Sequence, residues 1–410
     1  MSQIHSDVVI VGAGQGGAQA ALMLRQSGFA GSILVIGDEP DLPYDRPPLS
    51  KEYLLGEKTF ERLLLRTARD WEERGVSHLS DRRVTTVDPG NHSLLCADGT
   101  NVTYGKLIWS AGANPRRLAC SGHDLAGIHT IRFRADVDRL RAELPLVENV
   151  VVVGGGYIGL EAAAALKKLD KKVTVVEAQD RVLARVAGKP LSQFYEEEHR
   201  KRGVDLHLGA AVAAIEGDRG RTSRVRLAGG QILIADMVIV GIGVDPAVEP
   251  LLRCGAEGGN GVRVDEYCRT SLPDIYAIGD CAEHRNAFAQ NNLVRLESVQ
   301  NANDQAGVAA KSIVGQPQPY NAVPWFWSNQ FDLRLQTVGI LKDFDDLVVR
   351  GDPGTRSFSV VYLRQGKVIA LDCVNAVRDY SQGRILVGQG VRPDRAALAD
   401  PSIALKTLLT

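Results

Sequence analysis

Residues 8–17 read Val8-Val9-Ile10-Val11-Gly12-Ala13-Gly14-Gln15-Gly16-Gly17, and residues 18–24 after them are rich in alanine and leucine. The continuous apolar run predicts a buried strand, and the alanine- and leucine-rich stretch predicts a helix. The glycines between them have the spacing G-x-G-x-x-G. In this spacing Gly12 permits a tight turn, Gly14 lets the backbone approach a pyrophosphate, and Gly17 lets the helix pack closely on the strand. The stretch therefore predicts a dinucleotide-binding unit of an α/β fold.

A second strand and an acidic residue complete this unit. Residues 32–36 (SILVI) predict a strand that leads to Gly37-Asp38, about twenty residues after the last glycine. An acid at this place accepts hydrogen bonds from ribose hydroxyls, while the start of the helix offers free N–H groups to the phosphates. Strand, glycine turn, helix, second strand and acid thus occur in the expected order.

The whole pattern occurs a second time at residues 149–177. A strand at 150–153 is followed by Gly154-Gly155-Gly156-Tyr157-Ile158-Gly159, a helix at 160–169, a strand at 173–176 and Glu177. The flanks are also alike, with VVIVGAG at 8–14 and VVVVGGG at 150–156. We therefore expect two dinucleotide sites. Two glycine turns that bind no ligand would require both complete patterns to arise by accident.

Composition excludes several other classes of protein. Lysine plus arginine number 48 and aspartate plus glutamate 49, so the net charge of −1 argues against nucleic acid as the main partner. No apolar run reaches the roughly 18 residues of a membrane span. The first predicted strand begins by Val8, which leaves no room for a signal peptide, so we expect a cytoplasmic protein. The six cysteines and eight histidines are scattered, and we expect free thiols and no metal site.

A third segment, residues 270–280, predicts a strand that ends in Gly279-Asp280. With it the chain resembles the FAD- and NAD(P)-dependent pyridine nucleotide-disulfide oxidoreductases. The resemblance implies FAD at the first glycine turn, the nicotinamide nucleotide at the second, and Asp280 against the ribityl and phosphate portion of the flavin. Residues 104–113 and 238–246 resemble the two crossovers between the domains. Ser110-Ala111 replaces the usual Ala-Thr there, so we assign no hydroxyl contact at position 111.

The resemblance implies a glutathione-reductase-like α/β fold with two Rossmann-like domains and a small C-terminal α/β domain. We expect an FAD domain at residues 1–114 and 245–322, interrupted by an NAD domain at 115–244. The proline-rich stretch 317–324 predicts the linker to a C-terminal domain at 323–410.

Three further stretches of sequence indicate which group within this family the chain resembles. Residues 46–51 (RPPLSK) lie where disulfide-type members carry a reactive cysteine pair, and here there is none. With residues 295–302 and 323–330, they resemble the ferredoxin reductases of bacterial oxygenase systems, of the putidaredoxin reductase and biphenyl dioxygenase reductase type. Asn329 departs from the aspartate of most relatives and removes a negative charge. In this family electrons pass from NADH to FAD and then singly to a 2Fe-2S ferredoxin, which supplies a haem monooxygenase or a Rieske dioxygenase.

The resemblance also implies roles for three candidate catalytic residues. Lys51 would lie near flavin N5 and stabilise the reduced ring, although a lysine after a Pro-Pro turn could simply be solvated. Glu161 resembles the carboxylate that hydrogen-bonds the nicotinamide carboxamide, or it could be an acid stabilised by the helix dipole. Trp327 would cover the flavin toward the ferredoxin, or it could be core of the small domain.

Further residues are assigned to the two cofactors. Glu177 would select NADH because it would repel a 2′-phosphate, while Arg181 and Arg185 could pair with the pyrophosphate or partly rescue NADPH binding. Arg46 could brace its loop or neutralise a phosphate. The FAD residues are Gly12, Gly14, Gly16, Gly17, Asp38, Arg46, Lys51, Val84, Arg132, Asp280, Val299 and Trp327. The NADH residues are Gly154, Gly156, Ile158, Gly159, Glu177 and Arg185.

Other functions also fit this sequence. An NADH oxidase or a rubredoxin reductase of the same fold would differ only in the choice of acceptor. A flavin-bearing redox sensor is a reading from another class, and a disulfide reductase is disfavoured by the missing cysteines. We expect a transient complex with an acidic ferredoxin, for which Arg295 and Lys311 are candidate contacts, and a monomer or weak dimer.

Overall fold

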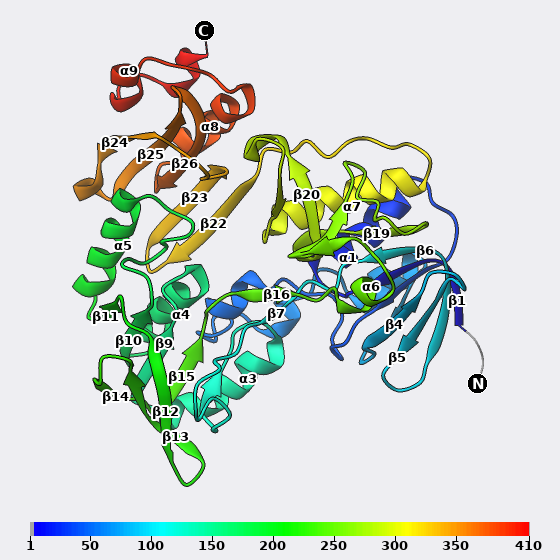
Figure 1. The fold of residues 1–410 in the computed structure, drawn as a ribbon, viewed down its shortest axis with the longest axis horizontal. Helices are drawn as coiled ribbons and strands as arrows, with labels where there is room; N and C mark the ends of the chain where they lie inside the picture. Colours follow the sequence, from blue (N-terminus) through cyan, green and yellow to red (C-terminus); the bar gives the residue numbers. More distant parts are fainter. Residues whose placement is uncertain (1–3, 410) are drawn as a thin grey trace. The chain divides into compact units, whose positions relative to one another are not determined.

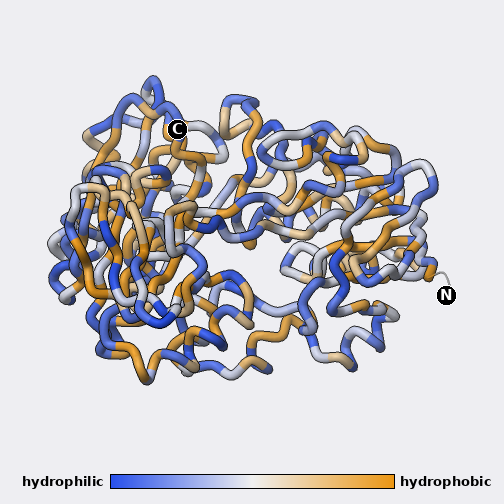
Figure 2. Tube along the Cα trace, turned by 60° about the horizontal axis from the view of Figure 1, so that its bottom comes forward, coloured by the Kyte–Doolittle hydropathy of each residue, from blue (hydrophilic) through white to orange (hydrophobic). Residues whose placement is uncertain are grey.

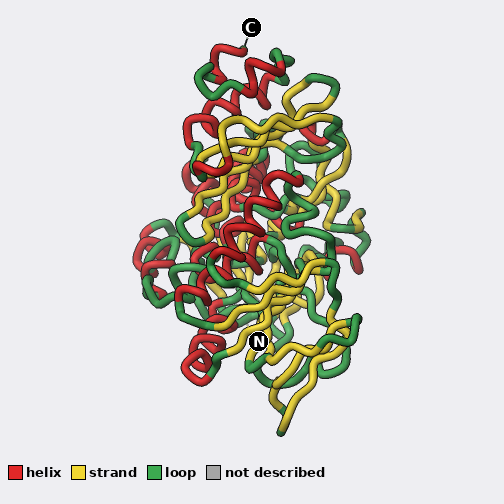
Figure 3. Tube along the Cα trace, turned by 90° about the vertical axis from the view of Figure 1, so that its left-hand side faces the viewer, coloured by secondary structure: helices red, strands yellow, loops and turns green. Residues whose placement is uncertain are grey.

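The computed structural model describes residues 4–409, which form two compact units (Figure 1). The first unit contains the residues up to Asp45, Phe60–Asn114 and Asp245–Pro324. The second contains Arg46–Thr59, Pro115–Val244 and the residues from Trp325 onward. The chain passes from one unit to the other five times, and two of these crossings lie in β7 (Ala113–Pro115) and β16 (Val244–Pro246). Helices and strands are mixed throughout the trace, as expected of an α/β chain (Figure 3).

The first unit is built on a mainly parallel sheet. Its strands follow the order β3-β2-β1-β6-β5-β4, with β19 parallel to β6. A smaller sheet has the order β17-β18-β20-β21, and α7 packs on α1. The elements are β1 (Ile4–Val11), α1 (Gln15–Gln26), β2 (Ile33–Ile36), α2 (Ala68–Glu73), β3 (Val76–Leu79), β4 (Val84–Asp88), β5 (Ser93–Cys96), β6 (Asn101–Trp109), α6 (Glu249–Arg253), β17 (Gly258–Gly259), β18 (Gly261–Val264), β19 (Ile275–Ala277), β20 (Ala282–Asn286), β21 (Asn292–Arg295) and α7 (Val299–Ile313).

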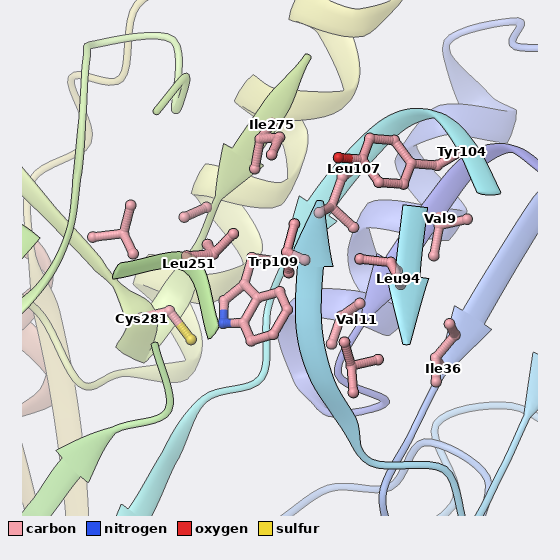
Figure 4. Close-up of a cluster of buried hydrophobic side chains, with 14 of the residues drawn as sticks. Val9, Val11, Ile36, Leu94, Tyr104, Leu107, Trp109, Leu251, Ile275 and Cys281 are labelled. Carbon is pink, nitrogen blue, oxygen red and sulfur yellow. The ribbon is translucent and has the colours of Figure 1, made fainter. Parts of the chain in front are cut away.

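Alternating residues of β1 supply two hydrophobic cores, one on each face of this sheet. Val9 and Val11 belong to the cluster that contains Trp109, and Figure 4 shows these side chains together. Val8 and Ile10 belong to the other cluster, with alanines of α1 and α7. Because side chains alternate across a strand, a run that is apolar at every position is what a sheet covered on both faces requires.

The second unit contains a parallel sheet of order β11-β10-β9-β15-β8, a three-stranded sheet β12-β13-β14 and an antiparallel sheet of order β22-β23-β26-β25-β24. Its elements are η1 (Pro47–Ser50), β8 (Ile128–His129), α3 (Arg134–Glu143), β9 (Asn149–Val153), α4 (Tyr157–Lys168), β10 (Lys172–Glu177), α5 (Lys189–Lys201), β11 (Asp205–Leu208), β12 (Val212–Asp218), β13 (Arg221–Leu227), β14 (Ile232–Ile234), β15 (Met237–Val240), β22 (Trp325–Gln330), β23 (Leu333–Gly339), β24 (Asp346–Asp352), β25 (Ser357–Arg364), β26 (Lys367–Val374), α8 (Val377–Gln389) and α9 (Arg395–Ala399).

The antiparallel C-terminal sheet shares a core with the second dinucleotide-binding region. Phe358, Val360 and Tyr362 of β25 are buried in one cluster with Leu191 and Phe194 of α5. The phenyl rings of Phe194 and Phe358 pack edge to face, with their ring centres 4.9 Å apart. This shared apolar surface explains why the C-terminal residues join the second unit.

Residues 46–59 also belong to the second unit by their contacts, whereas the sequence grouped them with the FAD domain. Tyr53 Oη donates a hydrogen bond of 2.5 Å to Asp138 Oδ1 in α3, and the guanidinium of Arg141 lies over the ring of Tyr53. These contacts therefore hold residues 46–59 against α3. The division into three domains stays a prediction.

Hydropathy along the chain alternates without one extended apolar segment (Figure 2). Among the helices in the described residues 4–409, none is both long enough and apolar enough to span a membrane. All six cysteines are free thiols. Within that same described part of the chain, no group of three His, Cys, Asp or Glu side chains could hold a metal ion.

Candidate functional site

The first glycine turn connects β1 to α1 without space for side chains. Gly12 has φ +111°, and a Cβ there would lie 2.2 Å from the Ser110 carbonyl oxygen. A Cβ on Gly17 would lie 1.9 Å from the oxygen of Gly12, so the first turn of the helix sits directly on the glycine turn. Gly14 is the N-cap of α1, and no described side chain caps this helix end. Its first N–H groups, with the partial positive charge of the helix start, are therefore available to bind an anion such as a pyrophosphate.

Asp38 lies beside this turn. A Cβ on Gly37 would lie 2.7 Å from the Cβ of Ala13, so the end of β2 runs close to the glycines. The Asp38 carboxylate is 40% exposed and lies 3.2 Å from Nη2 of Arg83. An exposed carboxylate next to the glycine turn can accept hydrogen bonds from a ribose, as the sequence predicts.

The Gly279-Asp280 segment follows β19, which is in the same sheet as β1. Gly279 has φ +70°, and its N–H donates a hydrogen bond of 2.7 Å to Gln305 Oε1. Arg295 Nη1 donates to the backbone oxygen of Asp280 at 3.2 Å. A Cβ on Gly16 would lie 3.5 Å from Ile278 Cδ1, so Gly16 is a packing position between α1 and this strand end.

The remaining FAD candidates of the first unit are Val84 and Val299. The Val84 side chain is buried in the core that contains Trp109, which leaves its backbone as the part available to a ligand. Val299 begins α7, directly after the N-cap residue Ser298, whose hydroxyl accepts from the N–H of Asn301 at 3.1 Å.

The second glycine turn repeats the geometry of the first. Gly154 has φ +109°, and its Cβ would lie 2.4 Å from the oxygen of Gly241. A Cβ on Gly159 would lie 2.0 Å from the oxygen of Gly154. Gly156, the N-cap of α4, differs because a Cβ there would meet no described atom within 4 Å. The helix start has no side-chain cap among the described residues, and the open space at Gly156 suits a nucleotide pyrophosphate.

Glu177 at the end of β10 is held against this turn. Its Oε2 accepts from the N–H of Gly155 at 2.6 Å, and its Oε1 accepts from the N–H of Gln179 at 2.8 Å. These two bonds fix the carboxylate where ribose hydroxyls of a nucleotide would lie, and they leave further lone pairs available.

The two arginines after Glu177 have different environments. Arg181 donates to the backbone oxygens of Ala187 and Ala184 at 2.8 and 2.9 Å and to Ser192 Oγ at 2.7 Å. It therefore supports its own loop. Arg185 is exposed, and so is Ile158 at the start of α4, with 43% of its surface accessible. Both exposed residues can meet a ligand at the second turn.

A buried ion pair in the same unit joins the residue after η1 to helix α4. Lys51 Nζ is 2.5 Å from Glu161 Oε2, and the side chains are only 13% and 3% exposed. Ser50 Oγ donates to the same oxygen at 2.6 Å, while Ser328 Oγ donates to Glu161 Oε1 at 2.7 Å. Both oxygens of Glu161 are thus occupied by side chains from η1 and β22. Sequence reasoning named Lys51 and Glu161 separately and missed their pairing and both serines, because no local pattern links these segments.

The ion pair borders an open pocket of about 330 Å³. Its lining contains lysine, arginine and carboxylate side chains together with Asn329. The lining residues include Lys51, Glu161, Lys168, Asn329, Asp332 and Arg334.

Arg46 and Arg132 are neighbours in the second unit. Arg46 Nη1 donates a hydrogen bond of 2.9 Å to the backbone oxygen of Arg132, and its guanidinium lies 5.2 Å from the ring centre of Phe133. Arg46 therefore braces the segment before α3 rather than its own loop, and its contact with a phosphate stays a prediction.

Trp327 of β22 is half-buried in a group of aromatic rings. Its ring centre lies 5.7 Å from that of Trp325 and 6.2 Å from that of Phe326. Phe326 in turn packs on Tyr157 at the start of α4, with ring centres 4.7 Å apart. The C-terminal strand therefore contacts the helix of the second glycine turn.

Comparison with known proteins identifies the family. The model of the pyridine nucleotide-disulphide oxidoreductases matches residues 6–306, and the model of the reductase C-terminal domain matches residues 325–409. The chain belongs to the pyridine nucleotide-disulphide oxidoreductase family. This confirms the predicted α/β fold and the predicted pair of cofactors, since the family uses FAD and NAD(P)H.

Several relatives within the family are ferredoxin reductases. The ferredoxin reductase subunit of 5,5'-dehydrodivanillate O-demethylase from a Sphingobium species is 59% identical, over 98% of each chain. A ferredoxin–NAD(P)+ reductase from a Sphingomonas species is 56% identical, over 100% of this chain and 99% of its own. A solved complex of putidaredoxin reductase with putidaredoxin has a reductase chain that is 35% identical, with a TM-score of 0.95 over 98% of each chain. The chain is an oxidoreductase of the ferredoxin reductase type, as the sequence predicted.

Proposed function

We propose that this protein passes electrons from NADH through FAD, one at a time, to an acidic 2Fe-2S ferredoxin that supplies a haem monooxygenase or a Rieske dioxygenase. The observation that carries the proposal is the Lys51–Glu161 ion pair, whose lysine lies in residues 46–51, where disulfide-type members have reactive cysteines. All six thiols are free, and none lies in residues 46–59. Electrons that arrive as a hydride therefore leave to an external acceptor.

Bound FAD would supply the redox chemistry, because a flavin takes up two electrons together and releases them singly. The protein's own residues bind and orient the two nucleotides and fix the charge around them. Gly12, Gly14, Gly17, Asp38 and Asp280 would hold FAD. Lys51, kept in place by Glu161, would present a fixed positive charge that favours a reduced, anionic ring.

The second glycine turn would bind NADH in preference to NADPH. The Glu177 carboxylate is fixed by the N–H groups of Gly155 and Gln179. It would accept hydrogen bonds from the ribose hydroxyls and repel a 2′-phosphate, and a difference of about 1.4 kcal/mol corresponds to a tenfold difference in affinity. Arg185 would pair with the pyrophosphate.

We place this activity in the cytoplasm, in a monomer or weak dimer of three domains that meets its ferredoxin transiently. An acidic partner would be attracted by a basic surface, for which Lys311 remains a candidate. Arg295 does not fit this role, because its side chain is only 5% exposed and its guanidinium lies 2.8 Å from Glu297. Trp327 would lie on the path of the electrons toward the partner.

The test measures NADH-driven electron transfer by the purified FAD-containing protein, with and without a 2Fe-2S ferredoxin. Cytochrome c reports the arrival of electrons, and oxygen consumption is recorded in parallel. We expect a large stimulation by ferredoxin with little use of oxygen. Rapid oxygen consumption without stimulation would instead identify an NADH oxidase, and slow turnover with every acceptor would identify a redox sensor.

A further inference from the structure

The loop between Glu177 and α5 lies against the second glycine turn. The N–H of Leu183, a residue with φ +54°, donates a hydrogen bond of 2.9 Å to the oxygen of Gly155. Arg181 spans the loop from inside through its bonds to Ala184 and Ala187. A backbone hydrogen bond therefore joins this loop directly to the second glycine turn.

The far end of the loop is held by the C-terminal sheet. The hydroxyl of Tyr362 in β25 accepts a hydrogen bond of 3.0 Å from the N–H of Gly188, the N-cap of α5. The same hydroxyl donates a bond of 2.6 Å to Asp372 Oδ2 in β26. A Cβ on Gly188 would lie 2.7 Å from Tyr362 Cε1, so the loop and the tyrosine ring are in direct contact.

This contact is deeply buried. Tyr362 is 0% exposed and Asp372 is 3% exposed. Burial raises the pKa of Asp372 to about 7, and the bond from the tyrosine hydroxyl opposes that rise. A buried N–H without a partner is unfavourable, so Gly188 depends on the Tyr362 hydroxyl for its bond. A hydroxyl that donates a hydrogen bond to a carboxyl group is polarised and therefore accepts a second hydrogen bond more strongly.

We propose that Tyr362, supported by Asp372, is a positioning residue for nicotinamide-nucleotide binding, through which the C-terminal sheet holds the 182–188 loop against the second glycine turn. The inference rests on the proposed function in one respect, that this turn binds the nicotinamide nucleotide. Arg185 and Val186 are the exposed residues within 182–188, and this anchor determines their placement.

The test uses Tyr362→Phe, which removes the hydroxyl and keeps the ring. The Kd for NAD+ of the full-length FAD-containing protein is measured by calorimetry, together with amide hydrogen exchange of residues 182–188. We expect the Kd to rise about five- to tenfold and exchange at the loop to accelerate. Steady-state kinetics should show a raised KM for NADH with an unchanged kcat at saturating NADH, a separation that general destabilisation would not produce.

Tyr195→Phe is the matched control. Tyr195 is buried in the same cluster, and its hydroxyl has no hydrogen-bond partner among the described residues. Its removal should leave the Kd within twofold of wild type. Asp372→Asn retains a hydrogen-bond acceptor for Tyr362 and should show a smaller effect than Tyr362→Phe. It also serves as the second variant if Tyr362→Phe does not fold.

The outcomes separate this inference from the proposed function. A wild-type protein that binds NAD+ and a folded Tyr362→Phe variant with the same Kd and the same loop exchange would overturn the inference alone. A wild-type protein that binds neither NAD+ nor NADH would overturn the assignment of the second turn, and the inference with it.

Discussion

Lys51 Nζ lies 2.5 Å from Oε2 of Glu161, and 110 residues separate the two in the sequence. Both side chains are largely withdrawn from water, at 13% and 3% exposure. Removing two charges from water is unfavourable, and their mutual attraction offsets it only where other hydrogen bonds complete the site. The hydroxyls of Ser50 and Ser328 provide those bonds.

We expect that removing one charge of this pair lowers the free energy of unfolding more than removing both charges. Glu161→Gln leaves the Lys51 ammonium buried without its counter-charge and should lower the free energy of unfolding by about 3 to 5 kcal/mol. The double variant Lys51→Met/Glu161→Gln should lose less than the sum of the two single variants. Denaturant unfolding of all four proteins measures this. Strict additivity would contradict an energetically coupled pair.

Trp327→Ala should separate the two halves of the reaction. We expect ferredoxin reduction to slow about tenfold, because the half-buried ring would lie between flavin and partner, and flavin reduction by NADH to change little. Stopped-flow measurement of each half-reaction checks this within one variant. An equal loss in both would exclude a specific role in transfer to the partner.

Glu177→Gln should change the choice of nucleotide. The variant keeps the size of the side chain and removes the charge that opposes a 2′-phosphate, so the ratio of kcat/KM for NADH over NADPH should fall about tenfold. Asp38→Asn, the equivalent change after the first glycine turn, is the control and should leave the ratio unaltered. A wild-type ratio near one would already contradict the role of Glu177.

Two glycines of the second turn should respond differently to alanine. Gly156 has an extended backbone with ψ −175° and open space around it, so Gly156→Ala should fold normally, retain FAD and bind NADH about tenfold more weakly. Gly159→Ala would place its Cβ 2.0 Å from the oxygen of Gly154 and should lower the Tm by several degrees. Thermal unfolding and NADH titration test both. Unchanged NADH binding in Gly156→Ala would mean that no ligand occupies the open space.

His199 should contribute to acid sensitivity. It is fully buried, with Nε2 2.9 Å from Gln330 Oε1, and burial lowers its pKa from 6.5 to about 4. Between these values the unfolded chain binds a proton that the folded chain does not, so stability is complete above about pH 6.5 and falls as the pH drops toward 4, by about 3 kcal/mol in total. His199→Gln should therefore lose less stability than wild type between pH 7 and 4.5, as measured by denaturant unfolding. An identical pH profile would contradict this.

Much of the fold could be predicted from local patterns. The two glycine turns are specified by residues such as Gly12 and Gly154, whose φ values of +111° and +109° and close backbone contacts no other residue tolerates. The acids Asp38 and Glu177 follow at the ends of the next strands because parallel strands finish at the same edge of a sheet. These features are local, with a strand, a turn and a helix in succession, and local sequence therefore determines them.

The assembly of distant segments was decided only by the tertiary structure. Lys51 directly follows η1, Glu161 lies in α4 and Ser328 in β22. Tyr362 lies in β25, and Gly188 is at the start of α5. No spacing along the chain encodes these contacts, since each arises where buried polar groups must find partners after the apolar surfaces have packed. The sequence alone thus determined the nucleotide-binding turns and the family, while packing decided which side chains support Glu161 and which residue anchors the loop beside the second turn.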